Sequence, residues 1–301
     1  MFREAYLDQV KLLVKVLPII GKERWFALKG GAAINLFVRN LPRLSVDIDL
    51  TYVGFEDRDV AIHNINASLD SIMSGVQKLG IKAVIRKYGN DVCKFICSDG
   101  RSQIKIEPNY TLRGYLYEPV NMRLCEAASS LGFASVPIMS MPDLYGGKLC
   151  AGLDRQHPRD LFDIMLLMNS EGISESILDG FVVALCGHNR APYELLSPNR
   201  QDYASILEKE FAGMSEIAFT TEDCNRTFSA MTSTVKKNLT DKQRQFLLDF
   251  FSLSNKSDQY AMPNVSRLPA LRWKQLNLQR LKQINLQKFE NQITLLEKAL
   301  M

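Results

Sequence analysis

The sequence has few of the residues on which many hydrolases and zinc proteins depend. Histidine occurs three times in 301 residues, at His63, His157 and His188, and the six cysteines are scattered without a Cys-x-x-Cys pair. Zinc sites need such ligands at close and regular spacing, and a Ser-His-Asp or Cys-His hydrolase needs a histidine partner. Scattered cysteines also do not form a disulfide framework, so we expect reduced thiols. The chemistry must therefore be sought among the carboxylates.

Long apolar runs are absent as well. No window approaches the roughly 18 consecutive apolar residues of a transmembrane helix. Charges within residues 1–20 interrupt any signal-peptide core. We therefore expect no membrane partner and a cytoplasmic location. With 46% hydrophobic and 23% charged residues, the chain has ample apolar material for a globular core.

The net charge of +4 is small but unevenly distributed. Residues 267–301 contain seven Lys or Arg and two Glu, which gives +5, so the residues before them sum to −1. A basic terminal helix predicts contact with a phosphate backbone, and the alternative is an ordinary solvated helix face.

Hydrophobic periodicity predicts a mixed α/β lobe followed by a helical lobe. Strands are expected at 26–28, 45–53, 81–88, 92–97, 103–110 and 134–139, with helices at 4–18, 32–39 and 57–79. After residue 143 strand patterns nearly vanish, and helices are expected at 143–153, 158–169, 174–188, 202–213, 222–238, 240–253 and 268–300. The predicted domains are 1–171 and 172–301, the second ending in a basic amphipathic helix.

The most informative segment contains two aspartates, Asp47 and Asp49, on a predicted strand. Alternate side chains of a strand share a face, so the two carboxylates point one way while Val46, Ile48 and Leu50 point into the core. Like charges side by side are costly, and divalent cations relieve that repulsion. A pair of Mg²⁺ ions about 4 Å apart suits phosphoryl or nucleotidyl transfer. The alternative is the solvated face of an edge strand.

Two further features extend this pattern. Gly30 and Gly31 lie between an apolar strand and a helical segment, where the backbone can approach a phosphate. Glu107 lies on a strand whose Ile104 and Ile106 fall on the other face, and it joins the two aspartates if the strands are neighbours. Separately, the glycines indicate only a turn, and Glu107 is equally a solvated strand residue. Together and in this order, the features favour a metal and nucleotide site.

The order of these motifs resembles that of the nucleotidyltransferase-fold toxins of the AbiEii/AbiGii type, which belong to type IV toxin–antitoxin and phage-defence systems and are similar to the MenT toxins. The resemblance covers about residues 25–168 and rests on the glycine pair, the Arg-x-Ser-x-Asp-x-Asp segment 43–49, Lys105-Ile106-Glu107, Gly147-Lys148-Leu149 and Arg159-Asp160-Leu161-Phe162-Asp163. It implies an α/β nucleotidyltransferase (polymerase-β-like) fold with a central mixed sheet, followed by an all-helical C-terminal lobe.

The resemblance also implies catalytic roles. Asp47 and Asp49 would bind Mg²⁺, for which Mn²⁺ could substitute. Glu107 would be a third metal ligand or the base that activates the acceptor hydroxyl. Lys148 would neutralise charge on the triphosphate of the NTP donor. Asp160 would orient Lys148 or contact the nucleotide, although it could also serve only as an ion-pair partner of a nearby Lys or Arg.

Nucleotide binding is expected from Gly30, Gly31 and Ser45, together with Lys148. One departure from the family pattern concerns Ala32, which stands where the family often has Ser or Thr after the glycines. A hydroxyl contact to the terminal phosphate is therefore missing at that position, and Ser45 is the candidate substitute.

The implied activity is Mg²⁺-dependent transfer of a nucleoside monophosphate from NTP to RNA, with the 3′ end of tRNA as the preferred acceptor, which would block translation. A toxin also implies a cognate antitoxin, either a DNA-binding protein or a kinase. Two alternatives stay open. The acceptor could be a protein or a small molecule of the aminoglycoside type, or the chain could be an inactive nucleotide- or RNA-binding module.

Overall fold

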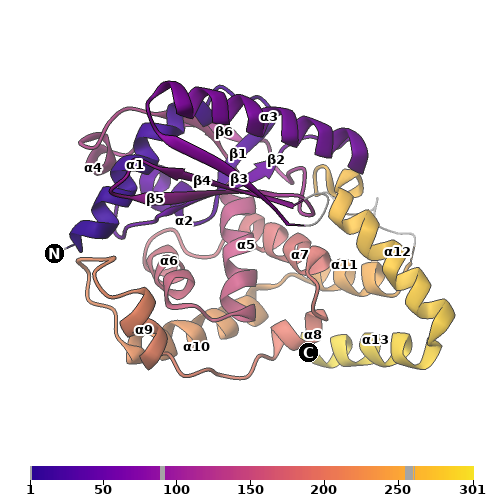
Figure 1. Ribbon diagram of the computed structural model, residues 1–301. Coiled ribbons are helices and arrows are strands. Elements are labelled where there is room, and N and C mark those ends of the chain that lie inside the picture. The colour runs from indigo at the N-terminus through magenta and orange to yellow at the C-terminus, as the bar shows by residue number, and fades with distance from the viewer. Residues whose placement is uncertain (1, 89–91, 255–259, 261) are drawn as a thin grey trace. The chain divides into compact units, whose positions relative to one another are not determined.

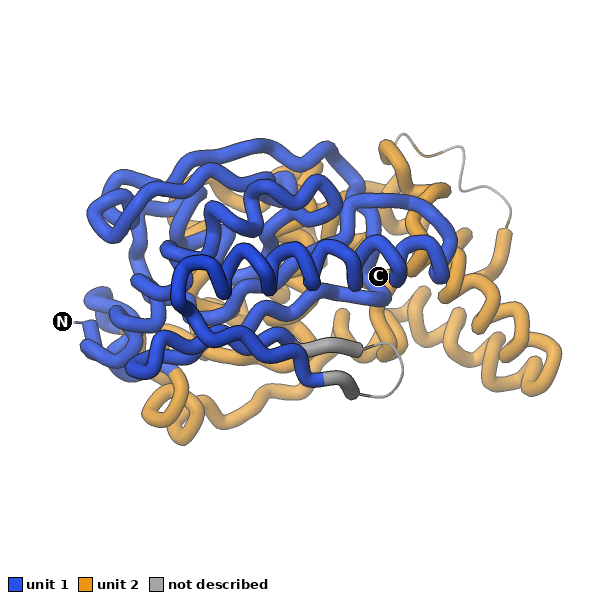
Figure 2. Tube along the Cα trace, turned by 45° about the horizontal axis from the view of Figure 1, so that its top comes forward, with its two compact units in different colours: residues 1–140, 211–218 blue, residues 141–210, 219–301 orange. Residues whose placement is uncertain are grey.

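The computed structural model describes residues 2–88, 92–254, 260 and 262–301. The chain forms two compact units, Met1–Ser140 with Phe211–Ala218, and Met141–Glu210 with Phe219–Met301 (Figure 2). This division differs from the expected boundary after residue 171. The helices α5 (Met141–Asp154) and α6 (Pro158–Asn169) belong to the second unit because they pack against α7 (Glu175–Gly187) and α10 (Thr221–Asn238).

The first unit is built on a seven-stranded mixed sheet in the order β3-β4-β5-β2-β1-β7-β6. Its strands are β1 (Phe26–Lys29), β2 (Asp47–Tyr52), β3 (Lys82–Tyr88), β4 (Val92–Ser98), β5 (Gln103–Asn109), β6 (Val120–Arg123) and β7 (Ser135–Ile138). Strand β2 is antiparallel to β1 and parallel to β5. The sheet confirms the predicted strands and adds β6, whose mostly exposed residues lack the alternation that would have revealed it.

Helices α1 (Glu4–Ile20) and α3 (Arg58–Lys78) pack against each other, and α3 runs along one side of the sheet (Figure 1). Asn64 of α3 donates a hydrogen bond to Tyr52 Oη (2.8 Å), so the Tyr52 side chain points toward α3. Ile48 and Leu50 alternate with the aspartates of β2 and share the face of Tyr52; both are fully buried. The two aspartates therefore lie on the face of the sheet turned away from α3.

The second unit is helical. Besides α5, α6, α7 and α10 it contains α8 (Pro192–Leu196), α9 (Ala204–Glu210), α11 (Asp241–Phe251), the short η3 (Val265–Arg267), α12 (Pro269–Ile284) and α13 (Leu286–Leu300). Helices α5 and α7 approach each other at two glycines, because a Cβ atom on Gly146 would lie 2.2 Å from the carbonyl carbon of Gly180. No helix within the described ranges is long and apolar enough to cross a membrane.

The predicted single helix at 268–300 is two helices. The chain leaves the helical conformation at Asn285 (φ −148°, ψ 82°), and Asn285 Oδ1 accepts a hydrogen bond from Lys288 N (2.9 Å) at the start of α13. A short polar side chain that caps a following helix competes with continuation of the preceding one. Apolar residues keep helical spacing on both sides of Asn285, which is why the periodicity alone predicted one helix.

Candidate active site

Three charged side chains lie in one row across the sheet. Asp49 of β2 is paired with Lys29 of β1 and with Glu107 of β5. Directly paired residues on neighbouring strands place their side chains on the same face. Asp47 lies two residues earlier on that face and is paired with Lys105. The strand of Glu107 is therefore the neighbour of the Asp-x-Asp strand, which was the condition for grouping the three acids.

The donor atoms of this group suit Mg²⁺, which prefers carboxylate oxygen. Within the described part of the chain, no three His, Cys, Asp or Glu side chains are placed so that they could hold a metal ion by themselves. Mg²⁺ is commonly bound by one or two protein carboxylates, with substrate phosphates and water completing its shell. Asp47, Asp49 and Glu107 have the donor atoms that Mg²⁺ prefers, and in the described structure they do not form a preformed three-ligand cage.

The glycine pair lies against this row. Gly30 has φ +70°, and a Cβ atom there would lie 2.5 Å from Asp49 Oδ2. A Cβ atom on Gly31 would lie 2.7 Å from both Ser45 Oγ and Arg43 Nη2. A side chain at either position would displace these neighbouring side-chain atoms, and at Gly30 it would also strain the backbone. The structure brings Gly30 to Asp49 and Gly31 to Ser45, and thus joins the two halves of the sequence pattern.

A helical segment begins at the glycines, as α2 (Gly30–Ala33) followed by the π-helix η1 (Ile34–Val38). Ala32, the departure from the family pattern, is completely buried. A serine or threonine at this position would have to find a hydrogen-bond partner inside the protein, because burying an unpaired hydroxyl costs free energy. Ser45, beside Gly31, is the hydroxyl nearest to the glycine pair among the predicted site residues.

Two basic residues of this region were not among the predicted site residues. Burial lowers the pKa of the Lys29 ammonium, and the negative charge of Asp49 opposes that shift. Arg43 is 2% exposed, and its Nη1 donates a hydrogen bond to the Leu44 carbonyl oxygen (2.9 Å). Arg43 begins the quoted segment 43–49, and Lys29 stands directly before the glycine pair. Sequence pattern alone does not separate a buried basic residue from a solvated one.

A segment distant in sequence, Phe211–Ala218, holds the loop that leads into β2. Leu44 N donates to the Met214 carbonyl oxygen (2.7 Å), and Ser215 Oγ donates to the Pro42 carbonyl oxygen (2.9 Å). Arg43 and Ser215 also form an isolated antiparallel bridge. These contacts fix the backbone just before the two aspartates, and no local pattern could have predicted them.

In the second unit, Lys148 of α5 is buried between two carboxylates of α6. Its Nζ lies 2.9 Å from Asp160 Oδ1 and 3.1 Å from Asp163 Oδ2, and the side chains of these aspartates are 1% and 0% exposed. Arg155 Nε lies 2.6 Å from Asp160 Oδ2. The structure therefore brings Lys148 and Asp160 together and adds Asp163 and Arg155 to the group.

The charges around Asp160 determine its ionisation. Burial by itself raises the pKa of this carboxyl, but the charge of Lys148 and the hydrogen bonds from Arg155 outweigh burial and hold the pKa well below its usual range. Asp160 stands in the first turn of α6, where an acidic side chain is favoured by the helix dipole. His157 caps this helix, since its Nδ1 accepts a hydrogen bond from Arg159 N (3.1 Å).

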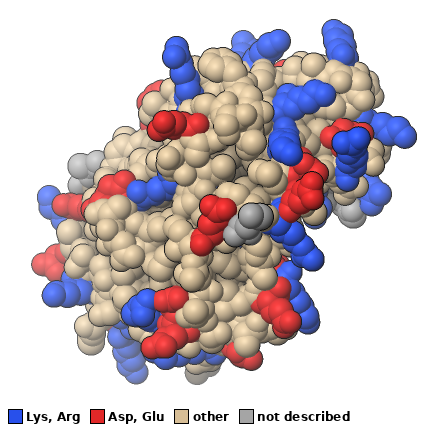
Figure 3. Space-filling view, turned by 90° about the vertical axis from the view of Figure 1, so that its left-hand side faces the viewer, with Lys and Arg blue, Asp and Glu red and all other residues tan. Residues whose placement is uncertain are grey.

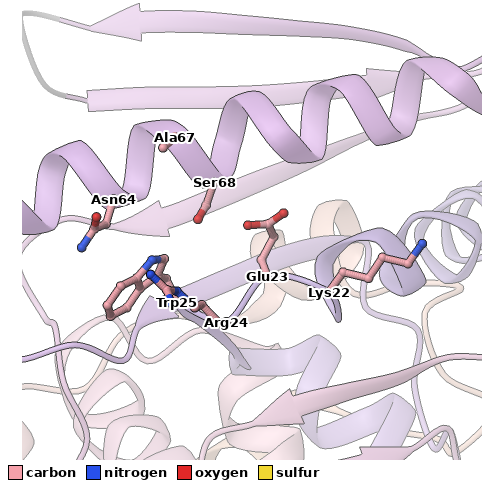
Figure 4. Close-up of a pocket in the computed structure, with 7 residues that line it drawn as sticks. All are labelled: Lys22, Glu23, Arg24, Trp25, Asn64, Ala67 and Ser68. Atoms are coloured by element: carbon pink, nitrogen blue, oxygen red, sulfur yellow. The ribbon is translucent and has the colours of Figure 1, made fainter.

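The first unit contains a pocket of about 430 Å³ (Figure 4). Its lining residues are Lys22, Glu23, Arg24, Trp25, Asn64, Ala67 and Ser68. It lies at the end of β1 and β2 where Phe26 pairs with Tyr52, whereas the charged row lies at the other end. The Arg24 guanidinium lies 4.6 Å from the Trp25 ring centroid, and Trp25 stacks on Tyr52 with 5.4 Å between ring centroids. None of the predicted site residues lines this pocket.

Comparison with known proteins identifies the family and a similar structure. The family model described as nucleotidyl transferase AbiEii toxin, type IV TA system, matches residues 11–261. Among solved structures, MenT4, a nucleotidyltransferase toxin from Mycobacterium tuberculosis H37Rv, matches with a TM-score of 0.62 at 12% sequence identity. The match covers 90% of this chain and 95% of that one. No curated protein matches the chain.

The similarity to MenT4 confirms the predicted mixed α/β nucleotidyltransferase fold, and its low identity limits the conclusion to the fold. The family match spans most of the chain and includes all the motifs quoted above. The chain therefore belongs to the AbiEii family of nucleotidyl transferase toxins of type IV toxin–antitoxin systems.

Proposed function

We propose that the chain is a metal-dependent nucleotidyltransferase that transfers a nucleoside monophosphate from an NTP to RNA, with the 3′ end of tRNA as its preferred acceptor. The observation that carries the proposal is the row of Asp49 and Glu107 on neighbouring strands, with Asp47 on the same face and Gly30 against Asp49. Family membership supports the transferase class. Modification of tRNA would block translation, which is a toxic outcome.

In the proposed reaction, the acceptor hydroxyl oxygen forms a bond to the α-phosphorus of the NTP. The bond from that phosphorus to the oxygen bridging to the β-phosphate breaks, and pyrophosphate leaves. Asp47 and Asp49 would hold Mg²⁺ or Mn²⁺, which neutralises developing negative charge when bound. Glu107 would accept the hydroxyl proton or serve as a third ligand. The absence of a side chain at Gly30 lets the Asp49 carboxylate lie against the backbone there.

The remaining predicted residues would act on the nucleotide. Lys148 would neutralise triphosphate charge, and Asp160 would orient its ammonium. The ion pairs of 2.9 and 3.1 Å to Asp160 and Asp163 hold this long, flexible side chain in one position. Gly31 and Ser45 would contact the phosphates, with the hydroxyl of Ser45 in the role that Ala32 cannot fill.

The test uses purified protein, total tRNA, Mg²⁺ and each of the labelled NTPs in turn. We expect label to enter RNA and EDTA to abolish the reaction, with recovery on addition of Mg²⁺ or Mn²⁺. Asp49→Asn should reduce labelling at least 100-fold, on the scale of a lost electrostatic group in a catalytic site. Asp70→Asn, at an exposed position on α3, is the matched control and should keep full activity.

Other outcomes separate the competing functions. Label in protein or in a small molecule, with none in RNA, would show that the acceptor is that molecule and not RNA. Calorimetric binding of NTP with Mg²⁺ but no product in any acceptor would identify an inactive binding module. In cells, expression should arrest growth, and arrest that persists in Asp49→Asn would contradict the catalytic proposal. NTP and tRNA pools place the proposed reaction in the cytoplasm, and the type IV family implies a cognate antitoxin as its regulator.

A further inference from the structure

The outward side of α12 carries large apolar side chains exposed to solvent. Trp273, Leu276 and Ile284 are 59%, 57% and 77% exposed. With Arg280, they follow helical spacing along one side of the helix. The opposite side of α12 packs into the second unit through the buried Leu271 and Leu278. Exposed apolar patches of this kind on a folded protein mark interaction sites.

The charge of α12 indicates what it binds. The helix contains Arg272, Lys274, Arg280 and Lys282 and no acidic residue. On the face that Figure 3 shows, by contrast, basic and acidic side chains are interspersed. Lys274 is turned inward, since its Nζ donates to the His188 carbonyl oxygen (2.7 Å), whereas Arg280 and Lys282 are exposed. A run of cations without anions suits a polyanion.

We propose that the outward side of α12 binds an unpaired segment of RNA, with Trp273 stacked on a base and Arg280 in contact with a phosphate. The inference rests on the proposed function, because it takes the acceptor to be RNA. An exposed indole presents a π-face on which any base can stack, and neighbouring cations follow the phosphate backbone. Trp273 and Arg280 are two helical turns apart, about 10 Å. One strand of RNA therefore meets both features at once.

Two copies of the chain would fit this surface less well. Pairing α12 with itself would bring together two helices that each carry four basic residues and no acid. Like charges across an interface are unfavourable. RNA supplies the opposite charge and the flat rings in the same molecule. Trp273 and Arg280 are both used in an RNA contact, whereas self-pairing would place like charges opposite each other.

The first experiment uses the fluorescence of Trp273. The chain has two tryptophans, Trp25 and Trp273, so Trp25→Phe leaves Trp273 as the single emitter. Adding Asp49→Asn removes turnover as it is proposed above, so that binding alone is measured. Titration with total tRNA should quench the emission of Trp273. In anisotropy measurements with fluorescein-labelled tRNA, Trp273→Ala should weaken binding about 5- to 150-fold, the range for one stacked base, and Trp273→Phe should retain most of the affinity.

The second experiment measures the charges. Arg280→Gln should flatten the salt dependence of tRNA binding, lowering the slope of log K against log salt by about 0.7. Lys237→Gln, at an exposed position of α10, is the matched control and should leave the slope unchanged. Far-UV circular dichroism should be the same in all variants, because every substituted side chain of this set is exposed.

Binding of Trp273→Ala within twofold of the parent, or emission of Trp273 that tRNA does not change, would overturn the proposal. So would a concentration-dependent dimer that Leu276→Glu and Ile284→Glu abolish, since the surface would then join copies of the chain. The two proposals fail separately. RNA labelling with Trp273→Ala binding unaffected rejects only this surface, and quenching of Trp273 without nucleotide transfer rejects only the activity.

Discussion

The contact between α5 and α7 determines where α5 can lie, and α5 carries Lys148. In Gly146→Ala the new Cβ atom would lie 2.2 Å from the carbonyl carbon of Gly180 and 2.4 Å from the nitrogen of Phe181. Both are backbone atoms, so no side-chain rotation can relieve the contact. Ordinary van der Waals contacts begin at 3.4 Å, which means that the two helices would have to separate locally by about 1.2 Å.

The cost of this separation follows from overpacking, which lowers the free energy of unfolding by about 1–3 kcal/mol. Contacts with two backbone atoms place Gly146→Ala near the upper end, about 3 kcal/mol. Replacing a mid-helix glycine by alanine returns up to about 1 kcal/mol, which leaves a net loss of about 2 kcal/mol. For a unit of about 150 residues, this lowers the melting temperature by roughly 4–8 °C.

The neighbouring residue provides the control. Gly147 is exposed, and a Cβ atom there would meet no heavy atom within 4 Å. Gly147→Ala should therefore raise the free energy of unfolding by about 0.5–1 kcal/mol. Urea unfolding followed by the emission of Trp273, in the Trp25→Phe background, reports on the second unit. RNA labelling should fall in Gly146→Ala, because α5 shifts with Lys148, and stay unchanged in Gly147→Ala.

Equal free energies of unfolding for the two alanine variants would refute this reasoning, because the two sites differ only in what surrounds the new methyl group. A stabilised Gly146→Ala would be equally damaging. Either result would mean that α5 and α7 do not approach each other at Gly146 and Gly180.

Two further predictions concern the buried charges around Lys148. Lys148→Met removes the cation that contacts Asp160 and Asp163 and should lower the free energy of unfolding by about 3–5 kcal/mol. The double variant Lys148→Met/Asp163→Leu should recover part of that loss. Thermal unfolding should therefore give the highest melting temperature for wild type, then the double variant, then Lys148→Met. The lowered pKa of Asp160 means that its stabilisation is complete above the unfolded-state pKa of about 3.9 and is lost as pH falls toward the folded-state pKa. The difference in unfolding free energy between wild type and Asp160→Asn should therefore be constant above about pH 5 and shrink as the pH falls below it. A difference that does not change with pH would contradict the ion pairing.

The local sequence pattern was sufficient to predict the strand that carries the two aspartates. Alternation of period two predicted that Asp47 and Asp49 share a face and that Ile48 and Leu50 are buried, and the structure confirms both. Val46 was expected in the core but is only half-buried, because β2 begins one residue later, at Asp47. Strand ends depend on pairing partners, and a one-residue difference there changes which side chains are covered.

The local pattern could not predict which strands pair with each other. The sequence predicted that Glu107 joins the aspartates only if its strand is the neighbour of theirs. Whether it is could not be read locally, because β2 and β5 pair residues about sixty positions apart. The contacts of Phe211–Ala218 with the loop before β2 join residues still farther apart in the sequence. A lone residue such as Lys29 or Arg43 carries no sign of such partners in its own neighbourhood. The missed basic residues are therefore those whose surroundings come from distant parts of the chain.

Lys148 shows where a further inference from sequence was available. Helices α5 and α6 are joined by three residues, 155–157, and helices joined by so short a connection often fold back as a hairpin. In a hairpin, residues at equal distances from the connection face each other, and Lys148 and Asp163 stand almost equally far from it. The contact of 3.1 Å between them follows this rule. Counting outward from the connection would have identified Asp163 as a partner of Lys148 with the same weight as Asp160, and would have predicted a buried lysine in place of a solvated one.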